Sequence, residues 1–202
     1  MRGTTEAYIA YRRLIGAIGI LLPFILLMGA GLRQSLSAYY YTNMEDIFSG
    51  ALIIIGVFLI IYSIYSIWDN VVTTIAGASA ILAALFPAEN DNLKWVSFLK
   101  ISPELSGILH MIFSALLFIL IAVMSLFLFT KTSGFMTTKK KIRNLIYRIS
   151  GIIILLLLVA LGIMNGFKLD WGDFTYYSET VMLLAFGISW FIKGETLFRD
   201  ER

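Results

Sequence analysis

The stretch Ser102–Phe129, SPELSGILHMIFSALLFILIAVMSLFLF, decides the fold class of this chain. After Glu104 it contains no Asp, Glu, Lys or Arg, and about 20 apolar residues of α-helix are enough to cross a bilayer core of about 30 Å. Ser102 and Pro103 form a good helix start, because Ser is a favoured N-cap and Pro is tolerated at the first helical position. The stretch therefore predicts a membrane-spanning helix over Pro103–Phe129.

The rest of the chain repeats this pattern of long apolar runs. Of its 202 residues, 59% are hydrophobic and 14% are charged, whereas a soluble domain is about 45–50% apolar and about 25% charged. We expect an all-α polytopic membrane protein, with residues 1–202 forming a single transmembrane helical bundle. Its six transmembrane helices are predicted at Leu14–Leu32, Ile47–Trp68, Val71–Phe86, Pro103–Phe129, Arg143–Met164 and Tyr176–Ile192. The third and sixth are short, and re-entrant or interfacial segments are the alternative for these two.

The basic residues orient the predicted bundle. With the N-terminus inside, the outer loops hold only Arg33, Lys94, Lys100 and Lys168, and every other Lys and Arg, as far as Arg199 and Arg202, falls inside. Loops on the cytoplasmic side of membrane proteins carry such an excess. We therefore expect both termini in the cytoplasm and a bacterial inner (plasma) membrane as the location. The start of the chain also resembles a cleavable secretory signal, whose removal would leave five helices.

The predicted third span, VVTTIAGASAILAALF (71–86), is rich in small residues. Ala76, Ala80 and Ala84 recur at four-residue spacing, beside Gly77. Because transmembrane helices associate through close packing of small residues, we expect this helix at the centre of the bundle, surrounded by protein. Asp69 and Asn70 would form the whole connection from the second span. Asp69 is then expected to be the N-cap of the third, with a proton or ion site as the alternative.

A basic run, TKTSGFMTTKKKIRNLIYR (130–148), follows the fourth predicted span. We interpret it as a topology determinant, although it could also attract anionic lipid headgroups at about 1 kcal/mol per basic residue. It does not indicate nucleic-acid binding, because it lies against a membrane and lacks the aromatic platform of single-strand binders. The chain has no cysteine, which excludes disulfides, thiolate metal ligands and a thiol nucleophile.

His110, the chain's only histidine, is the main candidate functional residue. Ser106, His110 and Ser114 are spaced by four and share one helix face, which we expect to look into the bundle. Ionisable side chains inside a membrane are costly and normally face protein or a water-filled cavity. We therefore expect a polar pocket under the outer headgroups. Its predicted ligand-binding residues are His110, Ser106, Ser114, Glu45, Asp46 and Glu179.

Several chemistries fit this pocket. The imidazole could be interhelical glue worth about 1–2 kcal/mol, with a carbonyl or carboxylate on one nitrogen and a hydroxyl on the other. It could pair with Ser37 or Ser114 as a hydrolytic nucleophile, or it could bind a lipid headgroup or a transported solute. A metal is disfavoured, because a single His without Cys would need several carboxylates to complete a zinc shell. We expect no cofactor.

The segment NLKWVSFLK (92–100) is a further feature of the outer side. If it forms a short helix, Trp95, Phe98 and Leu99 share one face, which would lie in the membrane interface with its apolar side towards lipid. Such a helix would act either as a lid over the pocket or only as a segment resting in the membrane interface.

Three stretches resemble a known family. They are SLSAYYYTNMEDIFSGAL (35–52), the DN…AGASAILAALFP of the third span, and LHMIFSALLF (109–118). Together they resemble the six-helix Frag1/DRAM-like membrane proteins and their uncharacterised bacterial relatives, a group placed in the CREST superfamily of membrane hydrolases. The resemblance covers Leu32–Phe129, with weaker similarity at AFGISWFIKGE (185–195). It implies that Ser37 matches the family's serine after the first helix and that His110 matches its fourth-helix histidine. The hydrolases use several histidines around a metal, so their chemistry does not transfer to a chain with one.

The leading functional hypothesis is a membrane protein that binds lipid or a protein partner through the pocket around His110. One alternative is a membrane-embedded lipid hydrolase or acyl-remodelling enzyme that uses Ser37 and His110. Another is an accessory subunit of a larger membrane complex. Transport is disfavoured, because the chain lacks the broken paired helices and repeated halves of carriers. From the sequence alone, these alternatives and the question of whether the chain is an enzyme stay open.

Overall fold

A computed structural model describes residues 2–62, 66–90, 92–132, 134–169, 171–195 and 197, with side chains described from Glu6 onward. The fold is all-helical, as predicted, and its elements follow in chain order. They are α1 (Arg2–Ala30), the 3-10 turn η1 (Ser37–Tyr41), α2 (Glu45–Ile61), α3 (Ile67–Leu85), α4 (Pro103–Val123), the π-helical turn η2 (Met124–Leu128), α5 (Thr138–Gly166) and α6 (Phe174–Lys193).

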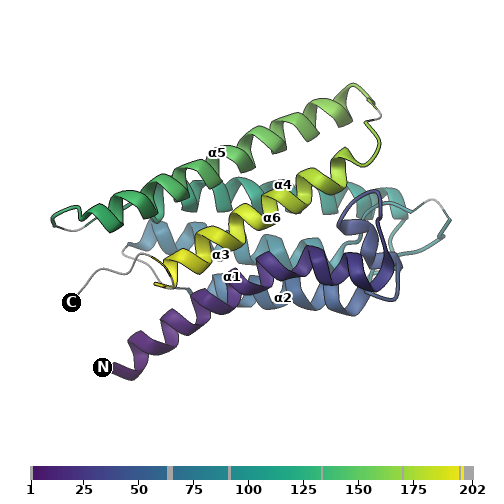
Figure 1. Cartoon of the computed structure of the whole chain (residues 1–202). Helices are drawn as coiled ribbons and strands as arrows, with labels where there is room; N and C mark the ends of the chain where they lie inside the picture. Colours follow the sequence, from purple (N-terminus) through teal and green to yellow (C-terminus); the bar gives the residue numbers. More distant parts are fainter. Residues whose placement is uncertain are drawn as a thin grey trace.

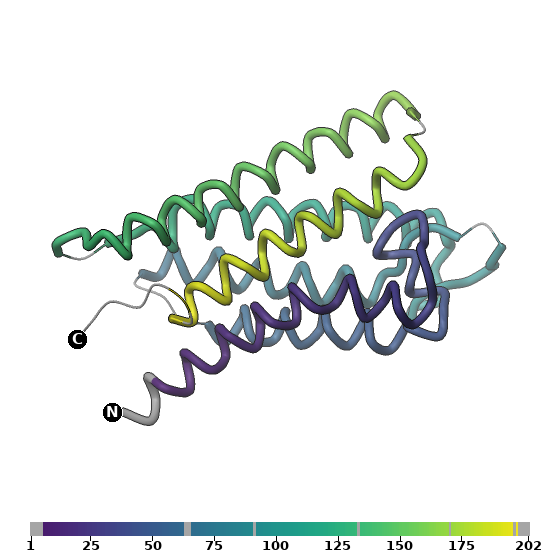
Figure 2. Tube along the Cα trace, in the orientation of Figure 1, coloured from purple at the N-terminus to yellow at the C-terminus, as the bar shows by residue number. Residues whose placement is uncertain are grey.

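The six helices form a closed ring. Each packs against its neighbour in the chain, and α6 packs against α1 to close the ring. The start of α1 and the end of α6 lie at one end of the bundle, which we call the terminal end (Figure 1). The α1–α2 and α3–α4 connections, including η1, lie at the opposite end, which we call the loop end (Figure 2). Consecutive helices therefore run antiparallel.

Within the described residues, four helical segments are long and apolar enough to cross a membrane: Glu6–Ala30, Ile67–Leu85, Pro103–Leu128 and Thr138–Gly166. They correspond to the first, third, fourth and fifth predicted spans. Large apolar side chains such as Met28, Trp68 and Leu156 are exposed on the outside of the ring, as expected of a surface solvated by lipid. Spanning by α2 and α6 stays a prediction, as does the orientation; Arg199 and Arg202 lie outside the described residues.

The predicted connection between the second and third spans is wrong. Helix α2 ends at Ile61 and α3 begins at Ile67, so Asp69 and Asn70 lie in the first turn of α3. Ser66 is the N-cap, and its side-chain oxygen accepts a hydrogen bond from the Asp69 backbone N–H at 3.2 Å. Ser followed three residues later by an acidic residue is a helix-start signature, which the apolar run across this junction concealed.

Small residues do pack α3, but α3 is not the central helix that we expected. It lies between α2 and α4, with Trp68, Val71 and Ile75 exposed. At the α2–α3 contact, a Cβ atom on Gly56 would stand 2.6 Å from the Gly77 carbonyl oxygen. Since real Cβ atoms essentially never come this close to an oxygen, these two backbones meet because neither residue has a side chain.

The segment Asn92–Lys100 is not helical. Val96 and Ile101 form an isolated antiparallel bridge, and Ser97 and Lys100 adopt positive φ values of 64° and 50°. The Ser97 hydroxyl donates to the Leu85 carbonyl at 2.8 Å, which satisfies an acceptor in the last turn of α3. Trp95, Phe98 and Leu99 are exposed, as the sequence indicated, but Phe98 and Leu99 lie on a tight turn and Trp95 precedes it.

Candidate functional site

His110 is buried at the α3–α4 contact near the loop end of the bundle. Its Nδ1 atom lies 3.0 Å from the Ala83 carbonyl oxygen and 2.8 Å from the Phe86 carbonyl oxygen. On the other side of the ring, Nε2 lies 3.3 Å from the Ser114 hydroxyl. A carbonyl can only accept, so Nδ1 carries the proton in the neutral ring and Nε2 accepts from Ser114.

The serine–histidine face of α4 therefore satisfies the end of α3. The last carbonyls of a helix have no partner within it, and Ala83 and Phe86 stand at the end of α3. One turn earlier on α4, the Ser106 hydroxyl donates to the Pro87 carbonyl at 2.8 Å. This is the arrangement that the interhelical-glue interpretation describes, with a carbonyl on one nitrogen and a hydroxyl on the other.

A cavity of about 60 Å³ lies inside the ring beside His110. Five of the six helices and the loop before α2 contribute to its wall, which is mostly aliphatic and aromatic. The polar side chains that line it are Ser37, His110, Ser114 and Glu179. The apolar lining residues are Leu22, Leu36, Phe48, Leu52, Ile55, Ala83, Leu117, Phe118, Ile121, Leu183 and Phe186. Since one water occupies at least about 10–15 Å³ by this measure, the space accepts a group of only a few non-hydrogen atoms.

Glu179 ties α6 to the loop before α2. Its Oε2 atom accepts a 2.6 Å hydrogen bond from the Leu36 backbone N–H, and the Ser37 N–H also bonds to this carboxylate. These amides belong to the start of η1, where N–H groups lack partners within the turn. Glu179 is thus a structural anchor for η1 and a carboxylate at the cavity wall.

The structure brings together four of the seven predicted site residues: Ser37, His110, Ser114 and Glu179. Ser106 is fully buried against Pro87 and does not line the cavity. Glu45 and Asp46 are exposed in the first turn of α2, away from the cavity wall. Acidic residues in the first turn stabilise the helix through its dipole, which explains their position without a ligand.

A second hollow, of about 540 Å³, lies at the surface of the loop end. Its charged lining residues are Arg33, Glu89 and Asp173, none of which is among the seven predicted site residues. Tyr41 also lines it and donates its hydroxyl to the Ala88 carbonyl at 2.6 Å. Burial raises the pKa of Tyr41 to about 12, so this hydroxyl stays a donor at neutral pH.

The contacts of His110 and the two serines bear on whether the cavity could perform hydrolysis. No hydrogen bond joins Ser37 to His110 among the described residues; the Ser37 hydroxyl instead pairs with that of Ser35 at 3.0 Å. Ser114 does contact Nε2, but two backbone carbonyls hold Nδ1 where a hydrolytic triad has a carboxylate. Across the described ranges, no three His, Asp or Glu side chains come together to hold a metal ion.

Comparison with known proteins places residues 13–172 in one family. The matching family model is described as "Protein of unknown function (DUF998)". No curated protein and no solved structure gives a significant match. Together with the four apolar helices, the match identifies the chain as an integral membrane protein. The comparisons do not extend to the Frag1/DRAM-like group, so that resemblance stays an expectation.

Proposed function

The chain belongs to this family of proteins of unknown function, DUF998, and from that premise we propose that it is a six-span membrane protein that binds the polar end of an amphiphile. The binding site is the cavity beside His110. The observation that carries the proposal is the convergence of Ser37, Ser114 and Glu179 from three separate segments on one otherwise apolar space. Ligand sites combine such apolar walls with a few polar groups that fix orientation.

The hydrogen-bonding groups define the chemistry of the ligand. His110 is fully used, and the Ser114 proton is directed to Nε2, which leaves the Ser114 oxygen as an acceptor. The Oε1 atom of Glu179 is a further acceptor beside the oxygen that holds Leu36. Acceptors thus predominate, and we expect a ligand whose polar end donates hydrogen bonds, such as a hydroxyl or a primary ammonium group.

The apolar wall defines the rest of the ligand. From His110 to Ile121 the lining runs along α4 for roughly 16 Å at about 1.5 Å per residue. Leu117, Phe118 and Phe186 line this deeper part. We therefore propose that the polar tip occupies the space beside His110 and that the hydrocarbon part follows these side chains between the helices.

Native mass spectrometry of the full-length protein, purified in a mild detergent, tests this function. We expect a retained lipid-sized mass that is reduced at least several-fold in Glu179→Gln and in Leu117→Trp, which fills the cavity. Glu104→Gln is the matched control, because Glu104 is exposed in the first turn of α4 and does not line the cavity. Retention that is equal in all variants, or no retained lipid in the wild type, would overturn the proposal.

The hydrolase alternative keeps one observation in its favour, the hydrogen bond between Ser114 and His110 Nε2. We rank it second because Nδ1 is held by neutral carbonyls and Glu179 is engaged by the amides of η1. The assignments to a bacterial inner membrane, with both termini cytoplasmic, are also part of this proposal. They rest on the distribution of Lys and Arg along the chain.

A further inference from the structure

The α1–α2 connection contributes to two spaces at the loop end of the bundle. Leu36 and Ser37 line the cavity of the proposed function, whereas Arg33, Gln34 and Ala38 line the surface hollow. Within the described part of the chain, the two spaces share no lining residue. At about 540 Å³ the hollow falls within the range of about 300–1,000 Å³ that is usual for small-molecule sites. It is therefore a candidate site separate from the cavity.

One wall of the hollow includes the end of the segment Leu85–Glu89, which follows from α3 and which we call the strap. Four consecutive carbonyls of the strap, from Leu85 to Ala88, each accept a hydrogen bond from a side chain of another segment. In the order of these carbonyls, the donors are Ser97 at 2.8 Å, His110 at 2.8 Å, Ser106 at 2.8 Å and Tyr41 at 2.6 Å. Most surface loops are mobile, whereas these four bonds hold the strap in one conformation.

Close packing against α4 fixes the position of Glu89 at the end of the strap. A Cβ atom on Gly107 would stand 2.7 Å from the Glu89 Cβ atom and 3.0 Å from the Glu89 backbone nitrogen. Glu89 thus lies where Gly107 leaves α4 without a side chain. The carboxylate of Glu89 therefore extends into the wall of the hollow from a backbone that both α4 and the strap hold in place.

Two further segments bring Arg33 and Asp173 to the same hollow. Arg33 lies between α1 and η1, in a connection that is closed by a 2.6 Å hydrogen bond from the Tyr39 hydroxyl to the Gly31 carbonyl. Asp173 is the N-cap residue of α6, but its side chain makes no capping hydrogen bond, so capping does not account for its position. Among the described residues, Arg33 forms no ion pair with either carboxylate. The hollow therefore presents positive and negative groups at separate places.

We infer that the hollow binds a small zwitterion, with Arg33 holding its anionic group and Glu89 and Asp173 holding its ammonium group. A guanidinium binds a phosphate or carboxylate through two parallel hydrogen bonds, and an ammonium group donates three hydrogen bonds that carboxylates accept. Gln34 and Asn90 add amide groups to the wall. The zwitterion is either the headgroup of phosphatidylethanolamine or a free compound of the same chemistry. This site does not depend on the proposed function.

Charge-neutralising variants of exposed residues test the site. Arg33→Gln is compared with Lys94→Gln, and Glu89→Gln with Glu104→Gln, because all four residues are exposed and the two control residues do not line the hollow. In the soluble arm, O-phosphoethanolamine is titrated by calorimetry into the full-length protein in an uncharged maltoside detergent. Ethanolamine and inorganic phosphate, each with one kind of charge, are titrated separately.

The lipid arm uses the same detergent with added phosphatidylethanolamine or phosphatidylglycerol, and native mass spectrometry measures the bound lipid. All proteins in this arm carry Leu117→Trp, so that the cavity beside His110 does not contribute. Binding in the soluble arm identifies a free compound as a ligand. Binding confined to the lipid arm, and specific for phosphatidylethanolamine, identifies the headgroup as the ligand.

We expect saturable binding of the zwitterion that weakens about fivefold in Arg33→Gln and in Glu89→Gln, the factor for about 1 kcal/mol per surface ion pair. The variants Lys94→Gln and Glu104→Gln should bind as the wild type does. Equal losses in lining and control variants, or no saturable binding in either arm, would overturn the inference. Singly charged compounds that bind as tightly as the zwitterion would also overturn it. Because Leu117→Trp fills the cavity and leaves the hollow unchanged, this inference and the proposed function can fail independently.

Discussion

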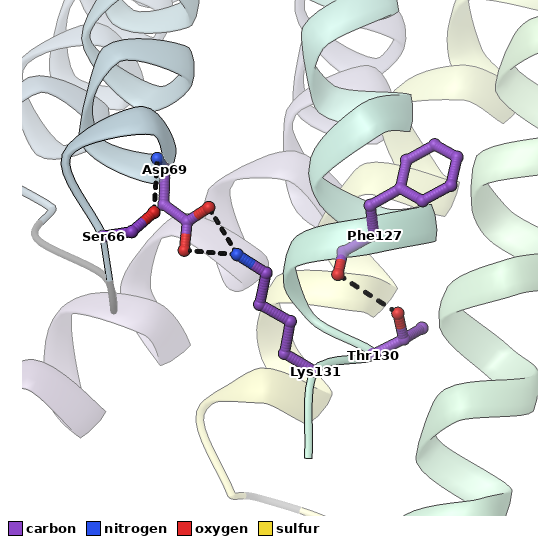
Figure 3. Close-up of polar contacts among 5 residues, drawn as sticks. All are labelled: Ser66, Asp69, Phe127, Thr130 and Lys131. Carbon is purple, nitrogen blue, oxygen red and sulfur yellow. Dashed lines mark hydrogen bonds and ion pairs between the residues drawn. The ribbon is translucent and has the colours of Figure 1, made fainter. Parts of the chain in front are cut away.

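Lys131 Nζ lies 2.6 and 2.7 Å from the two carboxylate oxygens of Asp69, which ties the first turn of α3 to the segment after η2 (Figure 3). The two partners are unequal: the Asp69 side chain is 5% exposed and that of Lys131 is 45% exposed. Removing Lys131 and removing Asp69 should therefore lower the free energy of unfolding by different amounts.

We expect Lys131→Met to destabilise the protein more than Asp69→Asn does. Lys131→Met leaves a buried carboxylate without its cation, at about 1–3 kcal/mol once the exposure of Lys131 is allowed for. Asp69→Asn leaves an ammonium group that water can reach, at about 1 kcal/mol or less. The double variant should resemble Asp69→Asn. The free energy of unfolding in detergent is measured for the wild type, both single variants and the double variant, with Lys141→Met as the control. Equal destabilisation by the two single variants would contradict this prediction.

A second prediction concerns the close contact of α2 with α3. Gly56→Ala should lower the thermal midpoint clearly, because its methyl group would stand 2.6 Å from the Gly77 carbonyl oxygen and force the helices apart. Gly50→Ala is the matched control on the same helix, since a methyl group there meets nothing within 4 Å. Alanine favours a helix interior over glycine by up to about 1 kcal/mol, so the control should be neutral or stabilising. A Gly56→Ala protein as stable as Gly50→Ala would mean that the backbones are not in contact.

The sequence predicted local features of this fold well. Apolar runs located six helices, and Ser102 with Pro103 marked the start of α4 correctly. The errors are at two helix starts, one cap lying within an apolar run and the other within the basic run. Ser66 starts α3, and Thr137, whose hydroxyl accepts from the Lys140 N–H at 3.0 Å, starts α5 ahead of the predicted Arg143. Both caps are visible in the sequence, but hydropathy alone gives them no weight.

The site was harder to predict because its contacts link distant parts of the chain. The spacing of Ser106, His110 and Ser114 indicated one inward helix face, but not that it would meet the end of α3. The bond between Glu179 and Leu36 joins residues 143 positions apart, and no local pattern signals it. Glu45 and Asp46 were selected for the same outer position as Glu179, yet the dipole of α2 accounts for acidic residues in its first turn.

A third prediction tests whether α2 and α6 cross the membrane. The chain has no cysteine, so single cysteines report unambiguously. We expect Asn43→Cys and Phe167→Cys, at exposed positions of the loop end, to react with a membrane-impermeant maleimide in intact bacterial cells. Trp68→Cys and Leu197→Cys, also exposed, should react only after permeabilisation. Identical labelling of the two ends of α2, or of α6, would show that the helix does not span.

A fourth prediction addresses the hydrolase alternative. A fluorophosphonate probe should leave Ser114 unlabelled in the full-length protein. The reason is that neutral carbonyls, rather than a carboxylate, orient His110, and its hydrogen bond to the hydroxyl is 3.3 Å long. Intact-protein mass spectrometry measures the adduct, and Ser114→Ala is the control. An adduct on the wild type that is absent from Ser114→Ala would promote the enzyme function above binding.

The last prediction distinguishes the two nitrogen atoms of His110. An Asn side chain places its amide nitrogen close to the position of Nδ1, whereas a Gln side chain places its own near Nε2. Because Nδ1 lies within hydrogen-bond distance of both the Ala83 and Phe86 carbonyls, His110→Asn should keep more stability than His110→Gln.

His110→Ala should lower the free energy of unfolding by about 2 kcal/mol, at about 1 kcal/mol for the hydrogen bonding of each ring nitrogen. Ser114→Ala, which removes only the contact to Nε2, should cost about 1 kcal/mol or less. Thermal or denaturant unfolding ranks Ser114→Ala, His110→Asn and His110→Gln against the wild type, with His110→Ala as the reference for the loss of both ring nitrogen atoms. We expect stability to fall in the order wild type, Ser114→Ala, His110→Asn, His110→Gln. This order follows only if His110 stabilises the protein mainly through its bonds to the end of α3. If His110→Gln were more stable than His110→Asn, the more important hydrogen bond would be the one at Nε2.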